Sequence, residues 1–177
     1  MNVIFNTELD LKWQTHGRYE LVSFKYKHAE FMIQIEKKPL DFKELKGKRT
    51  AEISFSRNDI QDVEKSHSTV GDVEFPAAIY GAVSNSLAVK FSDFDAFYFI
   101  ANRRHSKSSE EFNSKKKIYA FLADRVAKKV GAFFFEGKDG DDEAFLVTRI
   151  KVKKDGLVIE AEEARKKFNL ESQNEHI

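Results

Sequence analysis

Residues 91–150 constrain the fold of this 177-residue chain most, because three elements follow one another there with clear boundaries. Residues 94–101 are an almost uninterrupted apolar and aromatic run, which is typical of a strand covered on both faces. Ser108 and Glu111 have the spacing of a helix N-terminal capping box, and Gly131 provides a helix stop. The sequence therefore predicts a strand, a long helix and then an antiparallel hairpin.

The residues before this stretch predict strands followed by another helix. Residues 19–26, 30–37 and 52–56 are strand-like, and the second run alternates apolar with other side chains, as a strand with one buried face does. Residues 75–91 predict a helix, with Pro76 in its first turn and an apolar residue at every fourth position. The helix is expected to bury that apolar face against the strands.

The order of these elements predicts a mixed α/β or α+β fold. We expect a twisted, mostly antiparallel sheet with two crossover helices packed on it. Residues 58–72 are polar and predict a long loop. One domain is expected over residues 1–170, with a short charged helix near residues 160–168 and a frayed tail over residues 171–177.

Composition excludes several classes of site and partner. The chain has no Cys, so it has no disulfide, thiolate metal site or cysteine nucleophile. Its five His show no metal-ligand spacing, so no metal is expected. A formal net charge of +1 gives no global attraction to nucleic acid or membrane. Neither a signal peptide nor a run near the roughly 18 apolar residues of a membrane span is visible, so a cytoplasmic protein is expected.

The element order resembles the GNAT family of N-acetyltransferases, and in particular small GNAT-like proteins of tailed bacteriophages. The resemblance covers about residues 50–150. Its parts are the strand 52–56, Gly71 before the next helix, the aromatic strand 94–101 and the helical element 117–119. The resemblance implies a GNAT-like sheet and, for a phage-encoded protein, the host cytoplasm as its location.

The resemblance also implies a site for acetyl-CoA or another acyl-CoA. In GNAT enzymes the turn before the first crossover helix offers backbone N–H groups to the cofactor's pyrophosphate. The corresponding residues here are Val70, Gly71 and Asp72, although Gly71 is the only glycine present and Asp72 adds negative charge. Arg103 and Arg104 follow the central strand and are candidates to bind phosphate. A turn or a solvated loop without ligand is the alternative at both places.

The same resemblance assigns two catalytic candidates. Tyr119 matches the family's tyrosine that protonates the leaving thiolate, and Glu52, or a water that it orders, is the candidate general base. The alternative for Tyr119 is a core residue whose hydroxyl finds a local acceptor. Residues 115–117 are three lysines, which we expect on the exposed face of the long helix.

Two functions from different classes follow. The first is a GNAT-like N-acyltransferase that moves an acyl group from acyl-CoA to an amine. The second keeps the fold with a degenerate site, as an accessory or virion-associated protein that binds a host or virion protein. RNA binding through Arg103 and Arg104 is a weaker alternative, because the net charge is near zero. An unobstructed amide nest at residues 70–72 and an open cleft between the central parallel strands would favour the first function.

Overall fold

The structure, a computed structural model, describes residues 11–103 and 108–153. Strands come first, and helices then alternate with strands along this part of the chain. The elements are, in order, β1 (Gln14–His16), β2 (Tyr19–Tyr26), β3 (Ala29–Lys37), η1 (Lys43–Leu45), β4 (Thr50–Arg57), α2 (Val63–Ser68), η2 (Thr69–Asp72), α3 (Ala77–Phe91), β5 (Ala96–Ala101), α4 (Ser109–Val130), β6 (Phe133–Asp139) and β7 (Asp142–Thr148).

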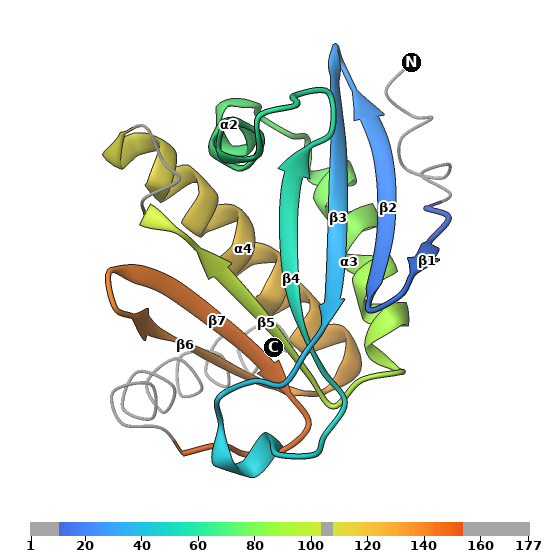
Figure 1. The fold of residues 1–177 in the computed structure, drawn as a ribbon, viewed down its shortest axis with the longest axis vertical. Helices are drawn as coiled ribbons and strands as arrows, with labels where there is room; N and C mark the ends of the chain where they lie inside the picture. Colours follow the sequence, from blue (N-terminus) through green and yellow to red (C-terminus); the bar gives the residue numbers. More distant parts are fainter. Residues whose placement is uncertain (1–10, 104–107, 154–177) are drawn as a thin grey trace, which may run out of the picture.

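The strands form one seven-stranded sheet in the order β1-β2-β3-β4-β5-β7-β6 (Figure 1). Every pair of neighbours is antiparallel except β4 and β5, which run parallel. Helix α3 connects these two parallel strands, and α4 connects β5 to β6 on the far side of β7. The prediction of a mostly antiparallel sheet with two crossover helices is confirmed.

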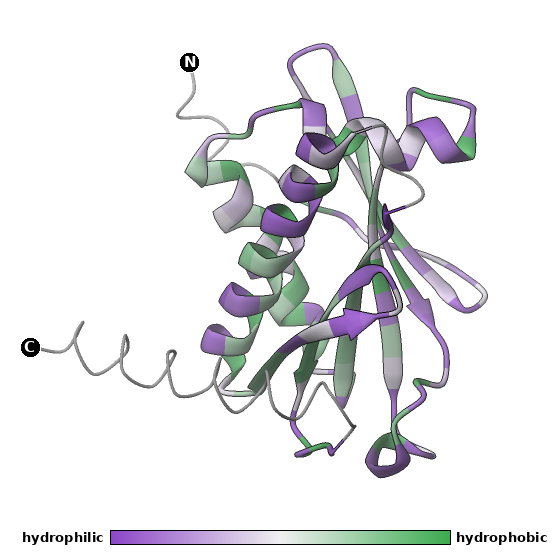
Figure 2. Ribbon diagram, turned by 90° about the vertical axis from the view of Figure 1, so that its left-hand side faces the viewer, coloured by the Kyte–Doolittle hydropathy of each residue, from purple (hydrophilic) through white to green (hydrophobic). Residues whose placement is uncertain are grey.

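Side-chain alternation explains the first half of the sheet. Along β3 the residues Ala29, Phe31, Ile33 and Ile35 are buried, and the residues between them are partly exposed. A tight turn joins β2 to β3, and its Lys27 adopts a positive φ of 55°. These buried residues face α3 and α4, which form a layer on one side of the sheet (Figure 2).

The two ends of α4 are set by local signals that the sequence carries. The Ser108 side chain accepts a hydrogen bond from the Glu111 N–H at 3.1 Å. At the other end, Gly131 has a φ of 68° and stops the helix in the left-handed conformation. The predicted start and stop of this helix are therefore confirmed.

Aromatic side chains fill the core between sheet and helices. Phe31 lies 5.4 Å from Phe55 and 4.8 Å from Phe75, measured between ring centroids. A second, smaller core lies on the other face of the sheet. It includes Leu40 and Leu45 from the β3–β4 connection. Both faces of β5 and β7 are consequently covered, as their apolar sequence requires.

The structure corrects one prediction of secondary structure. Residues 58–72 are not one long loop, because they contain α2 and η2. The Asp62 side chain caps α2 by accepting from the Lys65 N–H at 3.1 Å, and fully buried Val70 anchors η2 in the core. The predicted helix near residues 160–168 and the tail lie outside the described residues.

Two glycines should respond oppositely to alanine. Gly81 lies inside α3, where a Cβ would meet Arg125 at an ordinary 3.9 Å, so Gly81→Ala should raise the free energy of unfolding by about 0.5–1 kcal/mol. Gly131 has open space around it but a positive φ, so Gly131→Ala should lower that free energy by about 1 kcal/mol. Urea denaturation of both variants measures this, and shifts of the same sign would contradict the assigned backbone geometry.

Candidate functional site

The parallel strands β4 and β5 pair along only part of their length. The register joins residues 50–53 of β4 to residues 96–99 of β5 and ends there. Beyond this point β4 continues along β3 to Arg57, while β5 continues along β7 to Ala101. The strands separate toward their carboxyl ends in front of α4 (Figure 1). Open α/β sheets bind ligands at such strand ends, so this split is the first place to test the predicted site.

The hydroxyl of Tyr119 fills the split next to β4. Phe55 lies beyond the last paired residue of β4, so its backbone groups have no partner on β5. The Phe55 N–H donates to Tyr119 Oη at 3.0 Å, and this Oη donates to the Phe55 carbonyl at 3.4 Å. The Tyr119 side chain is 3% exposed, and burial raises the pKa of its hydroxyl to about 12. Tyr119 thus replaces the missing strand and satisfies both backbone groups of Phe55.

Lys115 lies one helical turn before Tyr119 and nearer to the open end of the split. The residue is only 2% exposed and forms no ion pair within the described part of the chain. Burial lowers the pKa of its ammonium to about 8, and the negative charge of Glu111 partly offsets this effect. The prediction that residues 115–117 are all exposed is therefore wrong for Lys115, which shares the inner face of α4 with Tyr119.

The predicted cofactor loop packs against α4. Val70 is fully buried in the core. A Cβ on Gly71 would lie 3.2 Å from Ser114 Cβ, so the backbone of Gly71 is in close contact with the helix. Asp72 is the last residue of η2, and α3 begins only at Ala77. Residues 70–72 therefore adjoin α4 rather than the N-terminus of the crossover helix α3.

The surroundings of Gly71 are acidic. A hollow of about 390 Å³ lies beside it. Its lining contains three carboxylates and no basic side chain, as follows: Thr69, Gly71, Asp72, Ser108, Glu110, Glu111 and Ser114. Arg57 lies 3.7 Å from Asp72 and offsets part of this charge, but the carboxylates of Glu110 and Glu111 still oppose the binding of a pyrophosphate.

Arg103 reaches the same part of α4 from the other side. Its backbone N–H donates to Asp142 Oδ1 at 2.8 Å, and its guanidinium lies 5.4 Å from the centre of the Phe112 ring. Arg104 lies outside the described residues. The structure thus brings Arg103 and Gly71 to the first turns of α4, on two different sides of the helix.

Glu52 lies on the sheet face opposite to α4. Its neighbours in β4, Ala51 and Ile53, belong to the core beneath the helices, so strand alternation directs Glu52 to the other face. Its carboxylate forms an ion pair with Lys38. The negative charge of Glu52 still contributes to raising the pKa of Tyr119. The two catalytic candidates therefore interact electrostatically but lie on opposite faces of the sheet.

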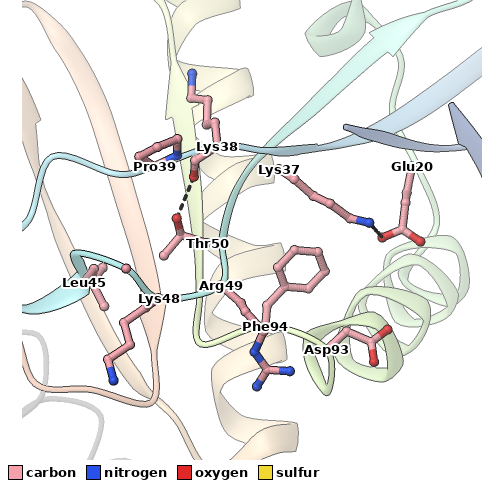
Figure 3. A pocket seen from close by; sticks show the side chains of 11 residues that line it. Glu20, Lys37, Lys38, Pro39, Leu45, Lys48, Arg49, Thr50, Asp93 and Phe94 are labelled. Carbon is pink, nitrogen blue, oxygen red and sulfur yellow. Dashed lines mark hydrogen bonds and ion pairs between the residues drawn. The ribbon is translucent and has the colours of Figure 1, made fainter. Parts of the chain in front are cut away.

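A cavity of about 540 Å³ lies at the other end of the sheet, where β3 ends and β4 begins (Figure 3). The sequence analysis did not identify this place. Four cations and two carboxylates are among its lining residues, which are Glu20, Lys37, Lys38, Pro39, Leu45, Gly47, Lys48, Arg49, Thr50, Asp93 and Phe94. The sequence feature that could have indicated this cavity is a pair of basic dipeptides, 37–38 and 48–49, at the end of β3 and just before β4.

No protein-family model, curated protein or solved structure matches the chain. Among the described residues, His, Asp and Glu side chains do not gather in any group of three or more that could hold a metal ion. In the same residues, no helix has the length and apolar character needed to cross a membrane. The function must therefore be argued from the geometry of the split and the cavity.

Removing the Tyr119 hydroxyl tests its role in the split. Tyr119→Phe should lower the free energy of unfolding by about 1–3 kcal/mol, because both backbone groups of Phe55 would be buried without partners. Tyr80→Phe is the matched control, since the half-buried Tyr80 hydroxyl forms no hydrogen bond within the described residues. The control should change stability by less than about 0.5 kcal/mol in urea denaturation. Equal effects of the two changes would exclude the bridging role of Tyr119.

The buried Lys115 predicts a stability difference that depends on pH. Its pKa falls from 10.5 in the unfolded chain to about 8 in the folded protein, so folding disfavours the charged form. The stability of the wild type relative to Lys115→Met should therefore decrease as pH falls from about 10.5 through about 8. A shift of this size corresponds to at most about 3 kcal/mol. Urea denaturation at several pH values measures it, and the exposed Lys117→Met should show no such trend.

Proposed function

We propose that the chain is a GNAT-like protein that acts by binding a partner rather than by transferring an acyl group. One observation carries this proposal: the Tyr119 hydroxyl is hydrogen-bonded to both backbone groups of Phe55. A tyrosine that protonates a leaving thiolate must present its hydroxyl to the cofactor. Here the hydroxyl pairs with the backbone of β4, which would otherwise have an unpaired N–H and carbonyl at Phe55.

The order and direction of the strands support the GNAT-like part of the proposal. The resemblance implies a central pair of parallel strands, each followed by a helix. In the sheet, β4 and β5 form the single parallel pair among the described strands. Helix α3 follows β4, and α4 follows β5. A short helical segment, α2 and η2, separates β4 from α3 and contains the residues that the resemblance assigns to the cofactor turn.

The environment of residues 70–72 supports a role without acyl-CoA. Gly71 is packed on Ser114, and the adjacent hollow carries the carboxylates of Asp72, Glu110 and Glu111. Backbone amides bind pyrophosphate only where they are free and face positive potential. The partner in this proposal is a protein, either of the host or of the virion if the chain is phage-encoded.

Lys115 favours a second candidate function, acyl-CoA-dependent acyl transfer. Its side chain is buried on the inner face of α4, one helical turn before Tyr119, and a phosphate or thioester in the split would meet it there. A buried cation without an ion pair is costly, and an anionic ligand would offset that cost. In this candidate Tyr119 leaves Phe55 to act as the general acid. Glu52, the predicted general base, lies on the opposite face of the sheet in an ion pair with Lys38, which counts against this candidate.

Titration with acetyl-CoA separates the two candidates. We expect no saturable heat on titration of the full-length protein and no rise in its melting temperature at millimolar ligand. A thiol-release assay with mixed amines gives an independent readout. The chain contains no Cys, so released coenzyme A would be the sole thiol in the reaction.

Micromolar binding of acetyl-CoA that is lost when Lys115 is replaced would overturn the proposal. The decisive comparison is Lys115→Met against Lys117→Met, which removes an exposed lysine from the same helix. Loss of binding in the first variant alone, together with thiol release by the wild type, would establish acyl transfer. Gly71→Trp adds a check on the predicted cofactor loop.

A further inference from the structure

The cavity between β3 and β4 has a fixed frame. The β3–β4 connection is anchored by Leu40, Phe42 and Leu45, which are buried in the smaller core. At the point where the connection closes, the Thr50 hydroxyl donates to the Lys38 carbonyl at 2.6 Å, and the Lys38 N–H donates to the Thr50 carbonyl at 3.2 Å. The walls of the cavity are therefore preformed, which lowers the entropy cost of binding a ligand.

Charge around the cavity is unevenly distributed. The buried Glu20 carboxylate forms ion pairs with two lysines, Lys90 at 2.6 Å and Lys37 at 3.9 Å. Asp93, two residues after the end of α3, adds a second carboxylate to the lining (Figure 3). The carboxylates of the lining thus gather at the end of the cavity that adjoins α3, together with the lysines that Glu20 binds.

The opposite end of the cavity is positive. Within the part of the chain that the structure describes, Lys48 forms no ion pair. The Arg49 side chain is 64% exposed, and its guanidinium lies 3.6 Å from Asp95. The pKa of Asp95 lies below its ordinary value, chiefly because its carboxylate accepts the Arg49 N–H. Asp95 therefore interacts with both the backbone N–H and the guanidinium of Arg49, and the guanidinium N–H groups that face away from Asp95 can bind a further anion.

Apolar groups lie between the two ends. The Phe94 ring stands between Lys37 and Arg49, and Pro39 and Leu45 also line the cavity (Figure 3). A volume of about 540 Å³ lies within the range of small-molecule sites, roughly 300–1,000 Å³. The lining thus combines three apolar side chains with charged groups, an arrangement that can contact both the body and the charged group of an amphipathic small molecule.

We infer that this cavity binds a small organic anion, whose apolar body contacts Phe94 and Pro39 and whose carboxylate, phosphate or sulfonate group is held by Lys48 and Arg49. Glu20 and Asp93 repel the anionic group from the other end and so fix one orientation. The site lies at the opposite end of β4 from Tyr119. It is independent of the proposed function, and neither depends on the other for its test.

An amide NMR titration of the full-length protein with anilinonaphthalene sulfonate, an aromatic anion, tests this inference. We expect saturable shifts concentrated at residues 47–50 and Asp93. The variant Lys48→Gln/Arg49→Gln should bind the probe roughly tenfold more weakly, because it lacks both cations that contact the sulfonate. Both side chains are exposed, so the variant should still fold. Lys46→Gln is the matched control, since Lys46 is an exposed neighbour outside the cavity.

Phenylnaphthylamine, a neutral probe of similar shape, separates charge recognition from apolar contact. The wild type should bind this neutral probe more weakly than it binds the sulfonate. The double variant should bind the neutral probe with the same affinity as the wild type does. Absence of saturable binding, shifts centred away from residues 47–50, or equal affinity of the double variant and the wild type would each overturn the inference. Equal binding of the two probes to the wild type would exclude recognition of the anion.

Discussion

Satisfying the backbone of β4 where β5 departs is the requirement on which the rest of the structure depends. Buried N–H and C=O groups must be paired, and Phe55 has no strand beside it on that side. Tyr119 supplies a donor and an acceptor with one hydroxyl. This contact fixes the position of α4 relative to β4. The placement of Lys115 in the split and of η2 against the first turns of α4 follows from it.

Local pattern was sufficient for most of the fold. The capping serine, the terminal glycine of α4 and the alternation in β3 act within a few residues, so the sequence predicts them directly. The segment before α3 was misjudged because its helices are held by side-chain caps and by one buried residue, Val70, and not by an apolar stripe. Hydrophobic periodicity carries no information about such a segment.

The site was only partly predictable, for physical reasons. The register of α4 places Tyr119 at the split, and the sequence analysis recognised both its catalytic and its core alternatives. Lys115 lies on the same face of α4 as Tyr119, but it was predicted to be exposed because lysine is rarely buried. The cavity arises when a connection of irregular structure folds back on the sheet, so its lining comes from separate segments that no spacing rule links.

The short ladder between β4 and β5 divides the sheet into two halves that are each contiguous in sequence. Strands β1 to β4 form one half, and β5 to β7 form the other, while the joint consists of pairs 50–53 with 96–99. Neighbouring strands from β1 to β4 pair across turns or one short connection, whereas the joint spans α3 and the pairing of β5 with β7 spans α4. The half from β1 to β4 can therefore form by local pairing, while both ladders of β5 close only over a helix. Strand β5 is accordingly the element whose pairing costs most loop-closure entropy on both of its edges.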